Sequence, residues 1–272
     1  MKKNLFIITI VFFSSVFGGC GNLFLVKDTQ EENLLLSRAS SFWGHGESFY
    51  WNGFAVLNNQ WGRQYASYGY QAIVKTDNNR IQFWYQWDGD SYHVKGYPTI
   101  IAGWHYGQPG GWLTSYGSFG LPSRVWDNKA FFVDLDASHG NQGSISQIMN
   151  LSWDIWLSYS DNPSSPDAEI MIWPWRISQQ PIGTKQGEVY FWSGYWDVYR
   201  GYMSSGGATW PVVSFVRKNT TLRAWGNLKD FINYVKSKNW ISNSMYIVGI
   251  ELGTELLKGQ GWFHLEKYTL NP

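Results

Sequence analysis

The sequence predicts a β-rich fold, and both its composition and its periodicity support that class. The 29 glycines separate many short runs that are typical of strands between turns. Within several of these runs large apolar residues alternate with polar ones, which is the period of a strand with one buried face. The chain also has 18 tryptophans, more than a core needs, which suggests stacking surfaces. At 272 residues it is large enough for one sizeable core, and all-β domains of this size commonly stay single.

Residues 1–19 are expected to be a targeting segment. Two lysines precede the apolar run Leu5–Phe17, which is too short and wrongly flanked for a spanning helix. The only cysteine, Cys20, follows two glycines, and this arrangement resembles a bacterial lipoprotein signal in which Cys20 becomes the lipidated first residue. Ordinary signal cleavage near the same glycines is the alternative. Either route exports the protein, as an outer-membrane or cell-surface lipoprotein or as a secreted protein, and one cysteine permits no internal disulfide.

Residues 20–47 are expected to be a tether. The stretch Lys27–Arg38 is polar and charged around three leucines, and it contains no residue pattern with evident chemistry. Strand signals begin near Ser48, so we assign residues 48–272 to the folded domain.

Strands are predicted in order along that domain. The clearest is Ile81–Trp87, which alternates strictly and ends in the turn Asp88–Gly89–Asp90, a hairpin signal. The other predicted strands are Phe49–Trp51, Tyr97–Trp104, Ala130–Leu135, Ile148–Leu157, Asp167–Trp173, Glu188–Trp192, Tyr195–Tyr199, Trp210–Val216, Met245–Glu255 and Trp262–Leu270.

One helix is predicted near residue 230. Leu228, Phe231, Ile232 and Val235 lie at positions i, i+3, i+4 and i+7, which places them on one helical face. Asn227 can cap the helix at its start. We expect this helix to pack on the back of a sheet and to be structural.

A glycine-rich loop follows the strand that ends at Trp104. Four aromatic residues in this region are candidates for a path along which a glycan stacks, although buried packing explains each of them equally well taken singly. They are Trp104, Tyr106, Trp112 and Tyr116.

The strand Asp167–Trp173 is the strongest candidate for a site. Alternation puts Ile170 and Ile172 on one face and Glu169, Met171 and Trp173 on the other. A carboxylate framed by an indole and a flexible apolar chain suits a groove that cleaves sugars, because the ring can stack on a pyranose beside the reacting carboxylate. A half-buried strand with a solvated glutamate is the alternative.

Asp154 is the second candidate in the strands. It is the only charge in the predicted strand Ile148–Leu157, between Trp153 and Ile155. An unpaired buried charge is costly, so we expect Asp154 to have a partner.

Several segments resemble glycoside hydrolase family 12. The two that carry the resemblance are Ala168–Trp173 and Gly253–Thr254–Glu255, which are similar to the active-site signatures of that family. Five more fall in family order and are Asn58–Gly62, Trp153–Ile155, Pro181–Gly183, Val213–Val216 and Asn219–Thr221. The resemblance covers roughly residues 48–272.

The resemblance implies an all-β fold, a β-jelly roll of two antiparallel sheets with a concave substrate cleft and one packed helix. It also implies a retaining, endo-acting hydrolase of β-1,4-linked glucans, whether cellulose-type, mixed-linkage or xyloglucan, that needs no cofactor. Glu169 would be the nucleophile, Glu255 the general acid/base, and Asp154 would hold Glu169 in place. Such a pair requires one protonated and one ionised carboxyl, so we expect a raised pKa for Glu255 and a low one for Glu169.

Substrate contacts are also implied by the resemblance. Asn59, Trp61 and Trp173 would line the subsites on the non-reducing side, and Met171 would pack beside the nucleophile. Glu251 departs from the family, which usually has glutamine there. Since Glu251 lies four residues before Glu255, we expect it to face the cleft and to bind a sugar hydroxyl.

Other functions receive less support from the sequence. A non-catalytic carbohydrate-binding jelly roll would not need paired carboxylates, and a family 11-type xylanase would not have these signature contexts. The five histidines show no metal-ligand spacing, and Asp134 and Asp136 suit a solvated strand edge better than calcium. The balance of 21 basic and 20 acidic residues gives no reason to expect nucleic acid as a partner. We expect a monomer that meets a membrane only through the lipid on Cys20.

Overall fold

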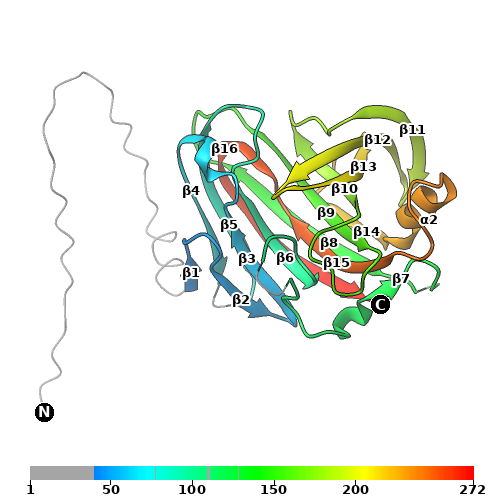
Figure 1. Ribbon diagram of the computed structural model, residues 1–272. Helices are drawn as coiled ribbons and strands as arrows, with labels where there is room; N and C mark the ends of the chain where they lie inside the picture. The colour runs from blue at the N-terminus through cyan, green and yellow to red at the C-terminus, as the bar shows by residue number, and fades with distance from the viewer. Residues whose placement is uncertain (1–39, 77, 109–110, 128) are drawn as a thin grey trace, which may run out of the picture.

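The computed structural model describes residues 40–76, 78–108, 111–127 and 129–272, and its strands form two layers (Figure 1). The outer sheet has the order β1-β4-β5-β16-β8-β14. Its bounds are β1 Ser40–Phe42, β4 Ala66–Lys75, β5 Ile81–Gly89, β16 Leu256–Asn271, β8 Phe132–Asn141 and β14 Arg223–Asn227.

The inner sheet has the order β2-β3-β6-β15-β9-β10-β13-β12-β11, with β7 also paired to β15. The first residues of β16 pair with β9, so this strand joins the two layers. The bounds are β2 Ser48–Trp51, β3 Phe54–Asn59, β6 Tyr97–Gly103, β7 Ser123–Arg124, β9 Ile148–Ser158, β10 Ala168–Ile177, β11 Thr184–Phe191, β12 Gly194–Ser205, β13 Ala208–Arg217 and β15 Tyr246–Gly253.

The predicted all-β fold with one packed helix is confirmed, with one difference in strand direction. We expected two antiparallel sheets, but β10 and β13 pair in parallel. The reason is topological. Strands β11, β12 and β13 form an antiparallel meander, and its third strand returns alongside β10 in the same direction. A parallel pair needs a long connection, which β11 and β12 supply here.

The main core lies between the layers, and β10 shows how the sequence divides its two faces. Ile170 and Ile172 belong to the main core, whereas Met171 and Trp173 belong to a second apolar cluster on the opposite face. The predicted alternation is therefore confirmed. Pro174 lies where the register of β10 against β9 shifts, so its missing N–H does not interrupt a regular ladder.

The single described helix is α2, Lys229–Ser237, as the periodicity predicts. The N-cap position is Leu228, one residue after the expected Asn227. Asn227 Oδ1 still accepts hydrogen bonds from the backbone N–H of Lys229 and of Phe131, at 3.0 Å each, so it ties the start of the helix to the residue that precedes β8. Phe231 lies on the buried face and contacts the rings of Trp196 and Phe215, at centroid distances of 5.0 and 4.9 Å. The helix covers the back of β12 and β13, as expected. Two short 3₁₀ turns complete the elements, η1 Arg63–Tyr65 and η2 Ser118–Gly120.

The domain begins earlier than Ser48. Residues 40–47, which we expected to belong to the tether, are part of the fold because β1 pairs with β4. The Asn58 side chain fixes them further, since its Nδ2 donates to the backbone carbonyls of Phe42 and Gly44 at 3.1 and 3.0 Å. The expected signal segment, Cys20 and the rest of the tether lie outside the described residues. Within the described ranges, no helix is long and apolar enough to cross a bilayer.

Candidate active site

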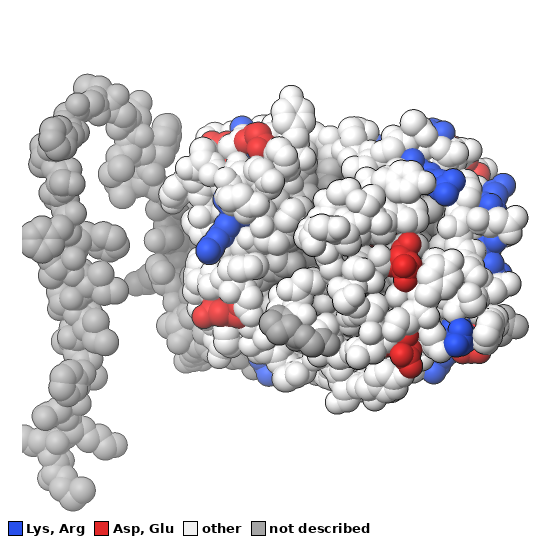
Figure 2. All heavy atoms as spheres, viewed as in Figure 1, with Lys and Arg blue, Asp and Glu red and all other residues white. Residues whose placement is uncertain are grey.

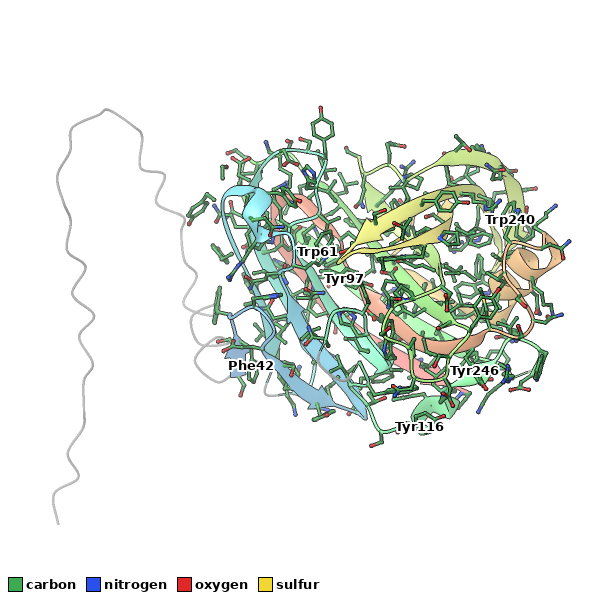
Figure 3. The ribbon with its side chains drawn as sticks, viewed as in Figure 1. Phe42, Trp61, Tyr97, Tyr116, Trp240 and Tyr246 are labelled. Carbon is green, nitrogen blue, oxygen red and sulfur yellow. The ribbon has the colours of Figure 1, made fainter. Side chains whose placement is uncertain are left out.

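A cleft of about 420 Å³ opens on the face of the inner sheet that is turned away from the main core. Figure 3 shows Trp61 and Tyr97 near the centre of the molecule, beside the pointed end of the hairpin formed by β12 and β13. The charged side chains on this side are few and scattered, and they form no continuous patch (Figure 2). The cleft is lined by His45, Asn59, Trp61, Tyr97, His105, Tyr106, Gly107, Gln108, Asp154, Trp156, Ser164, Glu169, Met203, Ser205, Gly206, Trp210 and Glu255.

Glu169 lies in the second position of β10, on the face opposite the core isoleucines. Its side chain is buried, and its Oε2 accepts a hydrogen bond of 2.7 Å from the indole Nε1 of Trp210 in β13. Burial raises the pKa of Glu169 to about 8, and the charges of Glu255 and Glu251 add to that rise, while the indole hydrogen bond acts against it.

Glu255 lies at the junction of β15 and β16, where its carboxylate is held by two amide donors. Its Oε2 accepts hydrogen bonds from Nδ2 of Asn150 and from Nε2 of Gln179, the latter at 2.6 Å. Asn150 Oδ1 also accepts from the backbone N–H of Glu255 at 3.0 Å, so one side chain orients both the main chain and the carboxylate. Burial raises the pKa of Glu255 to about 7, although the two amide hydrogen bonds favour the charged form.

Asp154 reaches the same cleft from β9. Its neighbours across the sheet are Met171 in β10 and Glu251 in β15. The partner that we expected is a neutral one, because Ser152 Oγ donates to Asp154 Oδ1 at 2.7 Å. Burial raises the pKa of Asp154 well above its usual range, and the charges of Glu169 and Glu255 raise it further.

The electrostatics of the three carboxyls differ from our expectation. We expected a low pKa for Glu169, but burial raises the pKa of Glu169 as well as that of Glu255. The single indole donor on Glu169 does not offset the loss of water around it. Because burial raises the pKa of all three carboxyls, and neighbouring carboxylates raise those of Asp154 and Glu169 further, we expect the three not to ionise together at neutral pH. Asp154 is best placed to keep a proton, because burial and the charges of Glu169 and Glu255 raise its pKa and the donor Ser152 is a neutral hydroxyl.

A buried chain of hydrogen bonds lies beneath one wall of the cleft. Nδ1 of His105 and Nε1 of Trp156 both donate to Oε1 of Glu251 at 2.6 Å. On the other side of the ring, Nε2 of His105 lies 3.2 Å from Nδ2 of Asn59. If Asn59 donates through Nδ2, His105 must accept at Nε2 and carry its proton on Nδ1, which is the proton that Glu251 receives.

Glu251 therefore does not lie where we expected. Its side chain has no exposed surface and does not line the cleft. The prediction correctly placed it on the same face as the catalytic candidates, but that face is covered at this point by His105 and Trp156, which intervene between Glu251 and the cleft. Glu251 contacts two side chains that line the cleft but offers no surface of its own to a sugar hydroxyl.

Similarity to known proteins assigns the chain to a family. The model of glycosyl hydrolase family 12 matches residues 52–271. The chain belongs to glycosyl hydrolase family 12. It is 28% identical over 246 residues to Endoglucanase S of Pectobacterium parmentieri, covering 88% of this chain and 89% of that one. It is 29% identical over 232 residues to a xyloglucan-specific endo-beta-1,4-glucanase A of Emericella nidulans, covering 82% and 87%.

Solved structures agree with this assignment. A family 12 xyloglucanase from Bacillus licheniformis in complex with ligand is 29% identical, covers 85% of this chain and 99% of its own, and superposes with a TM-score of 0.78. The native form of the Bacillus licheniformis enzyme is 30% identical with a TM-score of 0.77. The fold is therefore the jelly roll of family 12, and the protein is a glycoside hydrolase.

Of the other predicted substrate-binding residues, some line the cleft and some are buried beside it. Trp61 lines the cleft with 41% of its surface exposed, and Asn59 lines it while largely buried. Met171 and Trp173 are buried in the apolar cluster beside the cleft and do not line it. Trp104, which was a candidate from the glycine-rich region and not from the resemblance, is 1% exposed, and its indole donates to the carbonyl of Pro163 at 3.0 Å, so buried packing is the alternative that holds for it.

Four polar contributors to the family 12 site were not foreseen from the sequence. Asn150, Gln179 and Trp210 hold the carboxylates, and His105 links Asn59 to Glu251. Gln179 follows Ser178, a non-glycine residue with φ of 55°, so its aim toward Glu255 depends on a local bend that no alternation predicts. Trp210 lies in a strand that was predicted from the sequence. Its position beside Glu169 follows from the parallel pairing of β10 with β13, which was not foreseen.

The candidate cation ligands of the outer sheet have other partners. Asp134 pairs with Lys267, and Asp136 pairs with Nε of Arg223 at 2.8 Å. Among the described residues, no group of three His, Cys, Asp or Glu side chains is arranged to hold a metal ion.

Proposed function

We propose that this family 12 protein is a retaining, endo-acting hydrolase of β-1,4-linked glucans. The observation that carries the proposal is the presence of two glutamates in one aromatic-lined cleft, each with its own hydrogen-bond donors. The names of the relatives, an endoglucanase and a xyloglucan-specific endo-beta-1,4-glucanase, support the substrate class. Xyloglucan, mixed-linkage β-glucan and cellulose-type chains all remain within that class.

The proposed reaction is a double displacement. Glu169 attacks the anomeric carbon while Glu255 gives its proton to the departing glycosidic oxygen, which forms a glycosyl ester on Glu169 and releases the first sugar product. Glu255, now ionised, removes a proton from water, and the water oxygen attacks the anomeric carbon to release Glu169. A protonated Asp154 adds no negative charge beside Glu169, and the indole of Trp210 stabilises the ionised form of Glu169 that attacks.

Two variants separate the proposed roles. Glu255→Ala should cost about 10²- to 10⁴-fold on a glucan, but it should spare the first step on an aryl glycoside, whose leaving group needs little acid help. Glu169→Ala should lose activity on both, and azide added to it should yield a glycosyl azide with inverted configuration. Equal losses by both variants on the aryl substrate would show that the roles are wrongly assigned.

Stereochemistry tests the retaining step directly. Proton NMR of the earliest product should show the β anomer before mutarotation. Release of the α anomer would exclude the double displacement. Activity on xylan alone, with none on barley β-glucan, xyloglucan or carboxymethylcellulose, would exclude the substrate class.

We propose further that the enzyme is exported and held at a membrane through lipidated Cys20. The proposal rests on the sequence of residues 1–20 alone. Cys20→Ser should move the protein from the membrane fraction to the soluble exported fraction, and unchanged fractionation would remove this proposal.

A further inference from the structure

A second cavity lies at the far edge of the outer sheet, away from the cleft. Its volume is about 520 Å³, and it lies between β14, the turn joining β11 to β12, and the start of α2. These elements lie at the opposite side of the molecule from β1 and β2 (Figure 1). We call it the edge pocket, and its lining includes Phe132, Trp192, Arg217, Arg223, Trp225 and Asp230.

The edge pocket offers exposed aromatic faces. Trp225 has 76% of its surface exposed and Phe132 has 54%, although both belong to strands of a well-packed sheet. In the pair of β8 and β14, Phe132 lies opposite Asn227, and Trp225 lies opposite Asp134. The rings of Phe132 and Trp225 are therefore diagonal neighbours on the same outward face, at a spacing of roughly 7–8 Å. Such large exposed rings on a strand edge lower solubility, and they indicate a surface that meets a ligand.

The walls of the pocket are set by the backbone around Trp192. Trp192 and Ser193 form a two-residue turn with φ of 50° and 56°, a conformation that bulky residues rarely adopt. The ring lies against Gly226, where an added Cβ would come within 2.2 Å of the indole, and its Nε1 donates to Asp230 at 3.2 Å. The indole therefore forms a rigid wall.

The polar groups around the rings carry balanced charge. Arg217 and Arg223 bring two positive charges, and Asp230 and Asp136, the partner of Arg223, bring two negative charges. Arg217 keeps a buried Nε without a hydrogen-bond partner among the described residues. Balanced charge does not select an anion, whereas planar donors and carboxylate acceptors beside an aromatic face suit the hydroxyls and apolar ring faces of a neutral sugar.

We propose that the edge pocket is a second binding site for the neutral glucan chain, separate from the cleft. The inference rests on the proposed β-glucan specificity. Because β14 belongs to the outer sheet and the catalytic candidates to the inner sheet, a chain bound here leaves the cleft open. The site would hold the enzyme on the polymer between cleavages.

Binding can be tested without turnover in the Glu169→Gln background by native electrophoresis through gels containing tamarind xyloglucan or barley β-glucan. Trp225→Ala should weaken retention about three- to tenfold, and Trp225→Tyr should restore most of it. Trp126→Ala, at a tryptophan that is 54% exposed but does not line the pocket, is the matched control and should change nothing. Equal thermal midpoints establish that the variants are folded.

Activity separates this proposal from the proposed function. With Glu169 intact, Trp225→Ala should lower kcat/KM on the polymer and leave an aryl cellotrioside unaffected. Unchanged retention by Trp225→Ala in an enzyme that hydrolyses the glucan overturns the edge pocket alone. Failure of the unmodified enzyme on every β-glucan overturns the proposed function instead. Retention in polygalacturonate gels that depends on Arg217, with none in glucan gels, would overturn the neutral ligand.

Discussion

At the residue scale, the indole of Trp210 and the amide of Gln179 act on different carboxyls. Trp210 donates to Glu169 and Gln179 donates to Glu255. Each donor favours the ionised form of its acceptor, while burial favours the neutral form. Since a hydrogen bond to a charged group contributes about 1.5–3 kcal/mol, and one pKa unit corresponds to about 1.4 kcal/mol, each donor can move one limb of the pH profile.

Trp210→Phe tests the donor on Glu169. Without the indole N–H the pKa of Glu169 should rise further, so the nucleophile stays protonated to higher pH. The acidic limb of kcat/KM should move up by about one unit. Trp173→Phe is the matched control, because the buried indole N–H of Trp173 has no hydrogen-bond partner among the described residues. A shift of equal size in the control would mean that packing, and not the hydrogen bond, sets the limb.

Gln179→Met tests the donor on Glu255. The methionine keeps the length of the side chain but has no N–H, so the pKa of Glu255 should rise and the acid should keep its proton longer. The alkaline limb should therefore move up by about one unit. Gln180→Met, at the exposed neighbour, should leave the profile unchanged. An alkaline limb that moves down would indicate that Gln179 stabilises the neutral acid instead.

Glu251→Gln tests the buried chain under the cleft wall. Glutamine has one acceptor oxygen and adds two donors beside His105 and Trp156, so the ring of His105 and the amide of Asn59 should lose their fixed orientation. We expect KM for the glucan to rise. The charge of Glu251 raises the pKa of Glu169, so its removal should lower the acidic limb slightly and leave the alkaline limb in place. A KM equal to that of the unmodified enzyme would show that Glu251 does not position Asn59.

The sequence could identify the carboxyls but not the residues that hold them. Glu169 was predicted from strand alternation, and Glu255 from the family resemblance. The amides of Asn150 and Gln179 reach Glu255 over 105 and 76 residues of chain, through register and a bend that no local pattern encodes. For the same reason Glu251 was placed on the correct face, while the side chains that cover it could not be foreseen.

At the element scale, the sequence predicted the features that depend on neighbouring residues in the chain. The helix α2 and the alternation of β10 followed from periodicities of 3.6 and 2 residues. The strand β1 was missed because it is short, and its pairing with β4 depends on side chains such as Asn58. The parallel pairing of β10 with β13 is a property of the connection and not of either strand.

Phe231→Ala tests whether α2 is only structural. The side chain is fully buried against the rings of Phe191, Trp192, Trp196 and Phe215. Its loss should lower the free energy of unfolding by about 3–5 kcal/mol, measured by urea denaturation. Asn233→Ala, on the exposed face of the helix, should change it by less than about 0.5 kcal/mol. At a temperature where Phe231→Ala is still folded, its kcat/KM on an aryl glycoside should equal that of the unmodified enzyme, and a large loss would show that the helix also shapes the cleft.

At the scale of the whole molecule, the buried carboxyls of the cleft lower the stability of the fold at a pH where they ionise. Glu169 and Asp154 come from neighbouring strands of one sheet, and Glu255 joins them from the end of β15. Burial raises the pKa of each in the folded protein above its value in the unfolded chain. The unfolded state therefore gives up these protons at lower pH, so their contribution to stability is present in acid and is lost as pH rises through the folded pKa.

Glu169→Gln should consequently stabilise the protein in a pH-dependent way. At pH 4, where Glu169 is largely neutral in both states, the variant and the unmodified protein should unfold at similar urea concentrations. Above pH 8, which lies beyond the folded pKa of about 8, the neutral amide avoids a buried charge and should raise the free energy of unfolding by on the order of 5 kcal/mol. Glu188→Gln is the control, because Glu188 is an exposed partner of Lys218 and such pairs contribute little. A gain for Glu169→Gln that is the same at both pH values would mean that ionisation of this carboxyl does not limit stability, since packing alone would then explain the gain.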